Sequence, residues 1–377
     1  MEKILPHVED TDARPKVSVV LRCRNEYPVI LGTIHSFLED LEYYDYPIEF
    51  VVVSNLSDDS TFEILEDRFR RWTRTGLMKV VRYDERPSTW CAANAGIKAS
   101  TGEVVAVADA HVSLKTGTMH GLVQGALTHG GIWHAAVNKW GDIDKIRTYG
   151  YDLTLLRNFW GNPCLHIPPG VRDEDGRPRS HAVAMMGACL LVVRRDEIEK
   201  FGAYHHQFGV YGGGEPYLDL KWWLMGSAVY CYPEGLCRHA FGWRAQWQKV
   251  KRDKVAKRTI YKKDGKFCRD LKRGDEYLKF GKGYVRPDAE MYRNFMIAAY
   301  TLGGDAWLDH VRRQFQEKSR KLRDEIEKIA GRVTKESVAE RQFILGHQKL
   351  TFDQLLANPP WVHCGRHAKE NYSTLRK

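Results

Sequence analysis

The sequence lacks the long apolar runs of membrane-spanning or secreted chains. No stretch approaches the roughly 20 apolar residues that a helix needs to cross a bilayer. The first ten residues, MEKILPHVED, contain no apolar core of the kind found in signal peptides. Internal repeats and long low-complexity tracts are also missing. These absences favour a globular, cytoplasmic protein with no membrane partner.

Cysteine chemistry is also sparse. The eight cysteines have no framework spacing and form no CxxC pair, which argues against a disulfide scaffold and against structural zinc. Cys23, Cys91 and Cys189 lie among apolar or small residues, so we predict reduced thiols of a cytosolic protein. With 377 residues, of which 43% are hydrophobic, the chain can bury a substantial core. That core belongs to one large domain, or to a domain with an appendage.

Positive charge is concentrated in one segment. The chain carries a net charge of +10, and residues 243–283 alone contain fifteen Lys or Arg against five Asp or Glu. Outside this segment the chain is therefore close to neutral. Aromatic residues are interleaved with the cations, for example Tyr261 and Phe267. Cations that hold phosphates, together with rings that stack on bases, are typical of nucleic-acid binding. A solvated basic face is the simpler alternative.

Residues 17–140 alternate between strand-like and helix-like patterns. Such alternation predicts an α/β fold with a mostly parallel, doubly wound sheet, whose ligand crevice lies beyond the carboxyl ends of the strands. Asn25, Asn55 and Asp109 stand at such ends. The strands are predicted at 17–21, 50–53, 79–82 and up to Asp109, and the helices at 29–41, 60–72 and 89–99.

The second half of the chain is less regular. Residues 141–180 are rich in Gly, Pro, Arg and Asp and read as loops. A strand is predicted at 185–194, the Gly-rich segment Tyr211-Gly-Gly-Gly-Glu215 follows, and a helix is predicted at 217–225, before a strand at 228–232. Apolar residues at helical spacing predict one long amphipathic helix over 305–332, for packing or oligomerisation.

The tripeptide Asp109-Ala-His111 ends the buried run Glu103-Val-Val-Ala-Val-Ala. Residues i and i+2 of an extended segment point the same way, so the carboxylate and the imidazole can bind one divalent ion. Such an ion can stabilise a diphosphate leaving group. Taken alone, the motif also fits an Asp that begins a turn.

Four signals occur in a meaningful order, and together they carry a resemblance: Asn25-Glu26, Asp109-Ala-His111, Gly213-Gly-Glu215 and His239-Ala-Phe241. In this order, and with the block Met186-Gly-Ala-Cys-Leu-Leu-Val-Val-Arg-Arg, the chain resembles the GT-A fold glycosyltransferases, which have a Rossmann-like sheet. Among the family-2-like enzymes it is most similar to the polypeptide N-acetylgalactosaminyltransferase branch. The resemblance covers roughly residues 15–245.

The resemblance implies a metal site and a nucleotide-sugar donor. Asp109, His111 and His239 would be the metal ligands, and this mixed set suits Mn²⁺ (or Mg²⁺) better than calcium. UDP-sugar is the implied donor. One departure concerns the base, because Val53-Ser54-Asn55 replaces the usual Val-Asp-Asp. The residues implied in donor binding are Arg22, Arg24, Asn25, Glu26, Asn55, Arg86, Arg244 and Trp247.

The resemblance also implies a catalytic carboxylate. Glu215 would be the general base of an inverting enzyme, or would orient donor or acceptor in a retaining one. Asp219 is the second candidate, because Glu215-Pro216 replaces the Glu-Asp of many inverting relatives. The outcome leans to retention. The bland alternative is a flexible turn before a helix.

We expect a catalytic domain over 15–245, with a nucleotide-sugar half (about 15–140) and an acceptor half (about 141–245). A basic lid and acceptor-binding segment (246–300) and a helical C-terminal region (301–377) would follow. The acceptor-binding or nucleic-acid-binding candidates are Trp222, Lys251, Arg252, Lys257, Arg258, Lys262 and Lys263.

Three hypotheses about the function remain open. In the main one the enzyme glycosylates a hydroxymethylated pyrimidine of DNA, which the basic segment favours; a phage-encoded enzyme acting in the host cytoplasm would fit. In the second, the acceptor is a Ser or Thr of a protein. In the third, the chain is a non-enzymatic nucleic-acid-binding protein, against which the intact metal triad argues.

Overall fold

The computed structural model describes residues 2–57, 59–139, 146–154, 160–187, 189–240, 260–263, 266–269, 278–280, 283–285, 287–318 and 323–363. The strands are β1 Val17–Cys23, β2 Ile48–Asn55, β3 Met78–Tyr83, β4 Val104–Asp109, β5 Val112–Leu114, β6 Ile132–Lys139, β7 Ile146–Thr148, β8 Tyr151–Thr154, β9 Trp160–Pro163, β10 His181–Ala182, β11 Leu190–Arg194, β12 Val229–His239, β13 Ile260–Lys263, β14 Lys266–Arg269, β15 Leu278–Phe280 and β16 Gly283–Val285. The helices are α1 Val29–Tyr43, α2 Thr61–Arg68, α3 Arg70–Thr75, α4 Thr89–Ala99, α5 Thr118–His129, α6 Arg195–Phe201, α7 Gly214–Leu224, α9 Pro287–Gly303, α10 Asp305–Lys318, α11 Arg323–Glu336, α12 Val338–His347 and α13 Phe352–Ala357.

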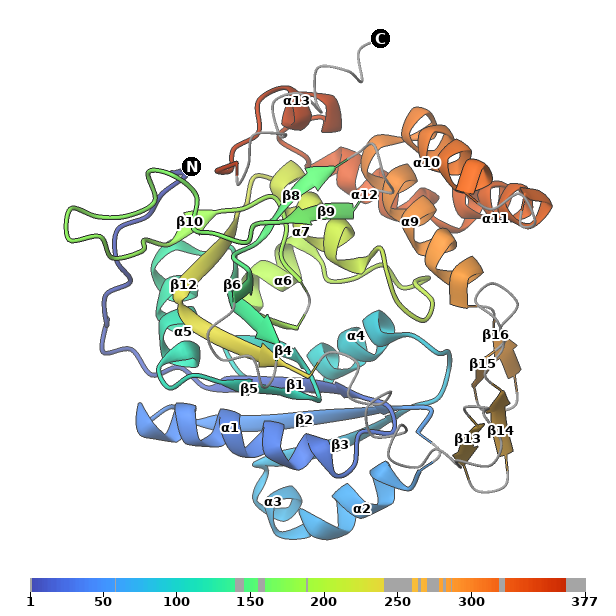
Figure 1. Cartoon of the computed structure of the whole chain (residues 1–377). Helices are drawn as coiled ribbons and strands as arrows, with labels where there is room; N and C mark the ends of the chain where they lie inside the picture. The colour runs from blue at the N-terminus through green and yellow to red at the C-terminus, as the bar shows by residue number, and fades with distance from the viewer. Residues whose placement is uncertain are drawn as a thin grey trace.

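The first four strands build a parallel half-sheet in the order β4-β1-β2-β3. Strand β1, VSVVLRC, is rich in β-branched residues and is buried along its whole length. Such residues suit a pleated surface that is covered on both faces. In the parallel register Arg22 lies beside Asp109, so the carboxyl ends of β1 and β4 reach the same edge of the sheet. The predicted ligand edge is thus formed by β1, β2 and β4 (Figure 1).

Beyond β4 the sheet is mixed rather than mostly parallel. Strand β11 runs antiparallel to β4 and to β6, whereas β12 runs parallel to β6. The small strand β5 pairs antiparallel with the end of β12. Strand β12 also carries an irregularity: Tyr232 pairs with Ala135 and Leu236 with Ala136, so the three residues between them bulge out. The α/β architecture is as predicted, and the reversal at β11 is the difference.

Helices α4, α1 and α5 pack against the sheet, and α7 joins it to the C-terminal helices. Helix α4 approaches β1 and β2 so closely that a Cβ on Gly96 would lie 2.3 Å from Val20 Cγ1. Its first turn is capped by Ser88, whose hydroxyl accepts from the Cys91 N–H at 3.0 Å. This capped end of α4 meets the carboxyl ends of the strands, where the site lies.

Two helix predictions differ from the structure. The predicted helix at 60–72 is divided into α2 and α3 at Phe69. The predicted long helix at 305–332 is replaced by α10 and α11, which lie side by side. Arg312 on α10 bonds Glu327 on α11 at 2.5 Å. Fifteen residues along one straight helix would place them about 22 Å apart. The described residues are helical and amphipathic, as predicted, but their apolar side chains pack among α9, α10 and α11.

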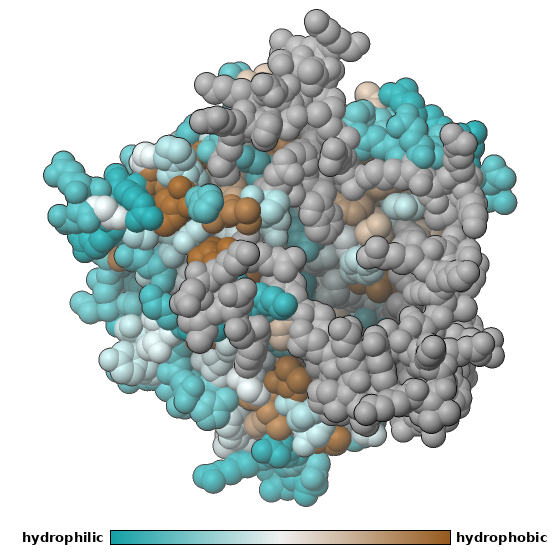
Figure 2. Space-filling view, in the orientation of Figure 1, coloured by the Kyte–Doolittle hydropathy of each residue, from teal (hydrophilic) through white to brown (hydrophobic). Residues whose placement is uncertain are grey.

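The remaining expectations can be stated briefly. The loop region predicted at 141–180 contains the short strands β7, β8 and β9 in its described part. Among the residues that the structure describes, five cysteines are free and buried, whereas Cys164 is disulfide-bonded, which departs from the prediction of reduced thiols. Within the described ranges no helix is long and apolar enough to span a bilayer. Figure 2 shows hydrophilic side chains over α10 and α11.

Candidate active site

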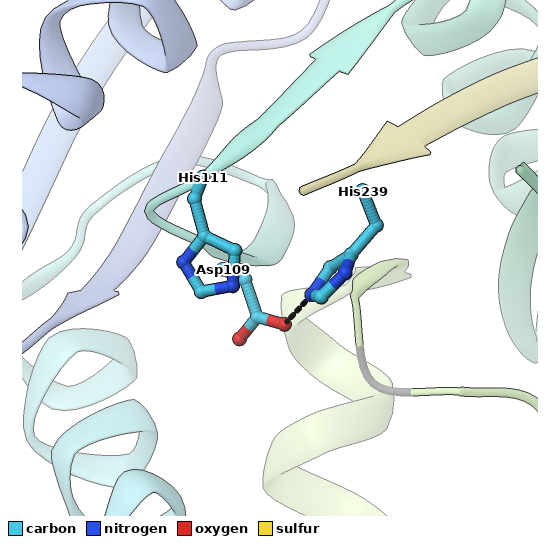
Figure 3. A group of neighbouring side chains, drawn as sticks. All are labelled: Asp109, His111 and His239. Carbon is cyan, nitrogen blue, oxygen red and sulfur yellow. Dashed lines mark hydrogen bonds and ion pairs between the residues drawn. The ribbon is translucent and has the colours of Figure 1, made fainter. Parts of the chain in front are cut away.

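Three side chains converge where β4, β5 and β12 meet. Asp109 ends β4, His111 occupies the turn before β5, and His239 ends β12. Because β5 pairs with β12 so that Val112 faces His239, the pairing brings the second histidine back to the first. The three side chains point toward one another (Figure 3). Residues 130 positions apart in the sequence thus form one cluster.

The geometry of this cluster suits one divalent ion. One potential ligand atom from each residue lies within 4.8 Å of the others. His239 Nε2 is 3.2 Å from Asp109 Oδ2, and the two imidazole rings are 4.7 Å apart between centroids. One carboxylate oxygen with two imidazole nitrogens is a donor set for a borderline transition metal such as manganese, rather than for calcium.

Neighbouring charges keep the Asp109 carboxylate ionised. Burial alone would raise its pKa, but Arg22 and the two histidines lower it well below its usual range. The Arg22 guanidinium is buried and donates to Asp109 Oδ1 at 2.5 Å. For His239, burial would lower the pKa, whereas the adjacent Cys189 and Asp109 raise it to about 9. The site therefore concentrates opposite charges at the end of β4.

Glu26 supports the second metal-ligand candidate. Its carboxylate is buried and lies 3.4 Å from His111 Nδ1. Carboxylates that bond one nitrogen of a metal-binding histidine fix the ring and make it a better ligand. Glu26, predicted in donor binding, is therefore placed behind the metal cluster.

A cavity of about 490 Å³ opens beside the cluster. Asp109, His239 and Arg22 supply polar groups to its wall, and Glu215 lines it from the first turn of α7. Most of the remaining wall is apolar and comes from Trp90, Val137, Tyr151, Pro163, Met185, Met186, Tyr211 and Pro216. An apolar cavity with a few convergent charged groups is the usual form of a ligand site.

Glu215 differs from Asp109 in its surroundings. Its Oε2 is buried and has no hydrogen-bond partner among the described residues. Burial raises the pKa of this carboxyl to about 7, although Arg22 partly opposes the shift. A carboxyl that titrates near neutrality can act as a proton acceptor or donor. The glycine loop (residues 209–213) immediately before α7 places it there, with Gly213 at φ 74°.

Two residues predicted near Glu215 lie elsewhere. Asp219 is buried, and its Oδ2 accepts from the Met186 N–H at 2.8 Å. Trp222 is buried, and its Nε1 donates to the Gly202 carbonyl at 3.0 Å. Neither is among the cavity-lining residues. This differs from the prediction of an active-site Asp219 and an acceptor-binding Trp222: both are buried in the core, about one and two turns further along α7 than Glu215.

Asn55 and Arg86 shape a loop beside the site. The Asn55 amide nitrogen donates to the Tyr83 and Arg86 carbonyls at 3.0 and 2.8 Å, and its Oδ1 accepts from the Ser88 N–H at 3.0 Å. With both N–H groups committed, Asn55 has little left for a nucleotide base. The Arg86 side chain donates to Gln207 Oε1 at 3.0 Å and is not part of the cavity wall.

Of the other predicted residues, four lie in the described part of the chain and six lie outside it. Arg24 and Asn25 follow β1 and are half-buried, and Asn25 has a φ of 59°. Lys262 and Lys263 lie on β13. Arg244, Trp247, Lys251, Arg252, Lys257 and Arg258 lie outside the described residues, so the basic lid stays a prediction.

Sequence reasoning missed Trp90, Cys189 and Tyr211, which all line the cavity. Trp90 could have been found, because it opens α4 at the carboxyl edge of the sheet. Cys189 and Tyr211 lie inside segments singled out from the sequence, the block 186–195 and the glycine-rich segment 211–215, but no role was assigned to either side chain.

The profile of glycosyl transferase family 2 matches residues 18–162, which span β1 to β9 and include Asp109 and His111. This region is a glycosyl transferase family 2 domain. The resemblance drawn from the motifs is therefore confirmed at the level of the family. The expectation of a phage-type DNA-modifying enzyme receives no support from the family match.

The chain is also similar in sequence to individual glycosyltransferases. Polypeptide N-acetylgalactosaminyltransferase 5 of Caenorhabditis elegans is 27% identical over 67% of this chain and 42% of its own length. Human polypeptide N-acetylgalactosaminyltransferase 9 is 29% identical over 58% of this chain and 37% of its own length. The chain thus spans less than half the length of these relatives. Both similarities reach beyond the family 2 domain itself.

The fold also matches that of a solved structure. The crystal structure of GalNAc-T7 with UDP, GalNAc and Mn²⁺ superposes with a TM-score of 0.57 over 89% of this chain and 58% of that one, at 16% identity. At this identity the match establishes the GT-A fold and nothing finer. The predicted fold class is confirmed.

Proposed function

We propose that this protein is a metal-dependent glycosyltransferase, which moves a sugar from a nucleotide-sugar, with UDP-sugar as the best candidate, to a hydroxyl acceptor. The observation that carries the proposal is the cluster of Asp109, His111 and His239 beside a cavity whose wall includes Asp109, His239 and Glu215. The family 2 domain and the donor and metal named for GalNAc-T7 support it.

The metal fits the residues that are present. Asp109, His111 and His239 would hold a manganese ion, and Mg²⁺ is the alternative. When bound, the ion supplies positive charge that stabilises the leaving diphosphate. Arg22 adds a fixed cation beside Asp109, and Glu26 orients His111. The roles that we propose for these side chains are thus to hold and align the donor's phosphates.

Glu215 would serve the acceptor. Its carboxyl lines the same cavity and titrates near neutrality because it is buried. In its ionised form it can accept a proton or a hydrogen bond from the acceptor hydroxyl. The apolar wall excludes water, which would otherwise hydrolyse the donor. Glu215 would therefore orient the hydroxyl, or deprotonate it.

We propose a protein Ser or Thr as the acceptor. The relatives named above are polypeptide N-acetylgalactosaminyltransferases, which supports a protein acceptor. The main expectation from the sequence, a hydroxymethylated base of DNA, rested on the charge of residues 243–283, most of which lie outside the described residues. Protein is thus the better-supported acceptor. The division into a catalytic domain (15–245), a basic segment (246–300) and a helical region (301–377) remains part of the proposal.

An acceptor screen tests the function. Purified protein with Mn²⁺ is offered UDP-GalNAc, UDP-GlcNAc, UDP-glucose or UDP-galactose, with Ser/Thr peptides, hydroxymethylated DNA or unmodified DNA, and the products are weighed by mass spectrometry. We expect a peptide that gains one hexose or N-acetylhexosamine. Matched peptides with Ser and Thr replaced by Ala are the control.

Each result has a consequence. Sugar on DNA but not on peptides would move the acceptor to the nucleic acid and keep the transferase. Transfer that is unaffected by Asp109→Ala or by chelation would end the metal proposal. If the protein is folded but the donor stays intact with every acceptor, the transferase proposal would be wrong.

A further inference from the structure

The C-terminal helix α9 covers the glycine loop that leads to Glu215. Met291, Asn294 and Phe295 lie on one face of α9, at helical spacing. A Cβ on Gly212 would lie 2.8 Å from Met291 Cγ and 3.3 Å from Phe295 Cε2. A Cβ on Gly213 would lie 2.8 Å from the backbone carbon of Asn294. The loop can therefore approach α9 this closely only because these positions are glycines.

Asn294 binds the same loop through both ends of its amide. Its Oδ1 accepts from the Gly209 N–H at 2.7 Å, and its Nδ2 donates to the Tyr211 carbonyl at 3.0 Å. The side chain is fully buried. An amide that pairs a backbone N–H and a backbone C=O of one loop fixes both the position and the twist of that loop.

The loop ends in a conformation that needs external support. Gly212 and Gly213 both have left-handed backbones, with φ of 81° and 74°. Gly213 is the N-cap of α7, and Glu215 lies in the first turn of that helix. The direction in which Glu215 enters the cavity therefore depends on the loop conformation two residues earlier. Tyr211, whose carbonyl Asn294 holds, also lines the cavity.

A second anchor lies one residue earlier on α9. The Arg293 guanidinium donates to the Gln207 carbonyl and, on its other side, bonds Glu336 of α11 at 2.6 Å. Gln207 in turn accepts from Arg86. The C-terminal helices are thus connected to the loop through Asn294 and to the segment just before it through Arg293.

We infer that Asn294 is a positioning residue for the proposed transfer: it holds the glycine loop so that Glu215 and Tyr211 face the acceptor. The inference rests on the proposed function. Asn294 itself does not line the cavity and acts through the loop. Its loss should therefore reduce the rate of transfer and leave the donor and metal site in place.

Asn294→Leu keeps the size of the side chain and removes both hydrogen bonds; Asn294→Asp keeps an acceptor for Gly209 and removes the donor to Tyr211. Thr301→Val is the matched control, because Thr301 is equally buried on α9 and bonds only the helix carbonyls of Ile297 and Ala298. UDP binding with Mn²⁺ is measured by calorimetry, transfer from UDP-GalNAc to the peptide found in the screen by kcat and KM, and loop order by amide exchange of residues 209–213.

We expect Asn294→Leu to lower kcat about 10- to 100-fold, as a displacement near 1 Å does, with UDP affinity unchanged. Amide exchange should quicken in the loop and stay constant in β4. Asn294→Asp should lie between Asn294→Leu and the wild type, which would be the partial rescue by a conservative change. Thr301→Val should match the wild type in every measurement.

Two results would overturn the inference alone: full kcat in a folded Asn294→Leu, or an equal loss in UDP affinity and kcat. If Asn294→Leu does not fold, Asn294→Asp decides by the same two criteria. An inactive wild type would instead overturn the proposed function and, with it, this role.

Discussion

The two carboxylates of the cavity are held in opposite ways. Asp109 stands among Arg22, His111 and His239, and its pKa lies well below the usual range. Glu215 has no partner for Oε2 among the described residues, and burial raises its pKa to about 7. Pairs of titratable groups whose surroundings push their pKa values apart commonly divide their roles between charge and proton transfer. In the proposed function, Asp109 would supply fixed charge at the metal, and Glu215 would hold a proton that can move.

The largest effect is expected from Asp109. Asp109→Asn keeps the shape of the side chain but removes the charge, so we expect at least a 10³-fold loss of transfer, on the order of the loss of one charged group in a metal site. Chelation of Mn²⁺ should have the same effect on the wild type. Asp84→Asn, at an exposed aspartate, is the control. Near-normal rates in Asp109→Asn would remove the difference between the two carboxyls.

A smaller loss is expected from Glu215→Gln. The change removes proton transfer but keeps a hydrogen-bonding group, which predicts a fall in kcat of about 10²-fold. Mn²⁺ and UDP affinity, measured by calorimetry, should stay constant. Because the replaced carboxyl is desolvated, the thermal midpoint should stay equal or rise. A clear fall in the thermal midpoint of Glu215→Gln would contradict the contrast between the two carboxyls.

Stability in acid tests another buried titratable group, a histidine close to the glycine loop. His205, buried before the glycine loop, has its pKa lowered to about 2, first by burial and then by nearby cations. Between that value and 6.5 the unfolded chain binds a proton that the folded chain does not, so stability falls as the pH drops below 6.5. At pH 5 we expect His205 to cost about 2 kcal/mol relative to pH 7. His205→Asn should flatten this part of the curve in urea unfolding at several pH values; an unchanged slope would place the acid sensitivity elsewhere.

The smallest effect on transfer is expected from Trp222→Phe. Trp222 packs against Phe201 and bonds the Gly202 carbonyl, away from the cavity. Removing that bond and part of the ring should lower the free energy of unfolding by about 1 to 2 kcal/mol. Transfer rates should stay within about twofold of the wild type, since such a change in the core leaves the cavity wall in place. A selective rise in KM for the acceptor would restore Trp222 to the acceptor site.

Local patterns predicted what local forces decide. The run ending at Asp109 was readable as a buried strand because β-branched and small apolar residues follow one another up to a polar end. The order of motifs then predicted which histidine would join Asp109, although only the pairing of β5 with β12 brings it there. The metal cluster was therefore within reach of the sequence.

Contacts between segments that are distant in the sequence could not be predicted from it. Asp219 and Trp222 were placed at the site because they follow Glu215 on the same helix. Positions four and seven residues further on share its face but lie about 6 and 10 Å further along the helix axis, where they meet the core instead of the cavity. The contact of Asn294 with Gly209 spans 85 residues and leaves no periodic pattern. The long helix predicted at 305–332 failed for a similar reason, since its hydrophobic stripe is satisfied by a neighbouring helix.

The bulge in β12 has a consequence for how this site can vary during evolution. Residues up to Tyr232 are registered by β6 and β10, whereas His239 is registered by β6 and β5. Residues gained or lost at 233–235 change only the size of the bulge, because the pairing on either side is fixed independently. A residue lost between Leu236 and His239 instead reverses which side chains face the cavity. The number of residues between Asp109 and its second histidine is thus free to drift at one point and constrained within four residues of the ligand.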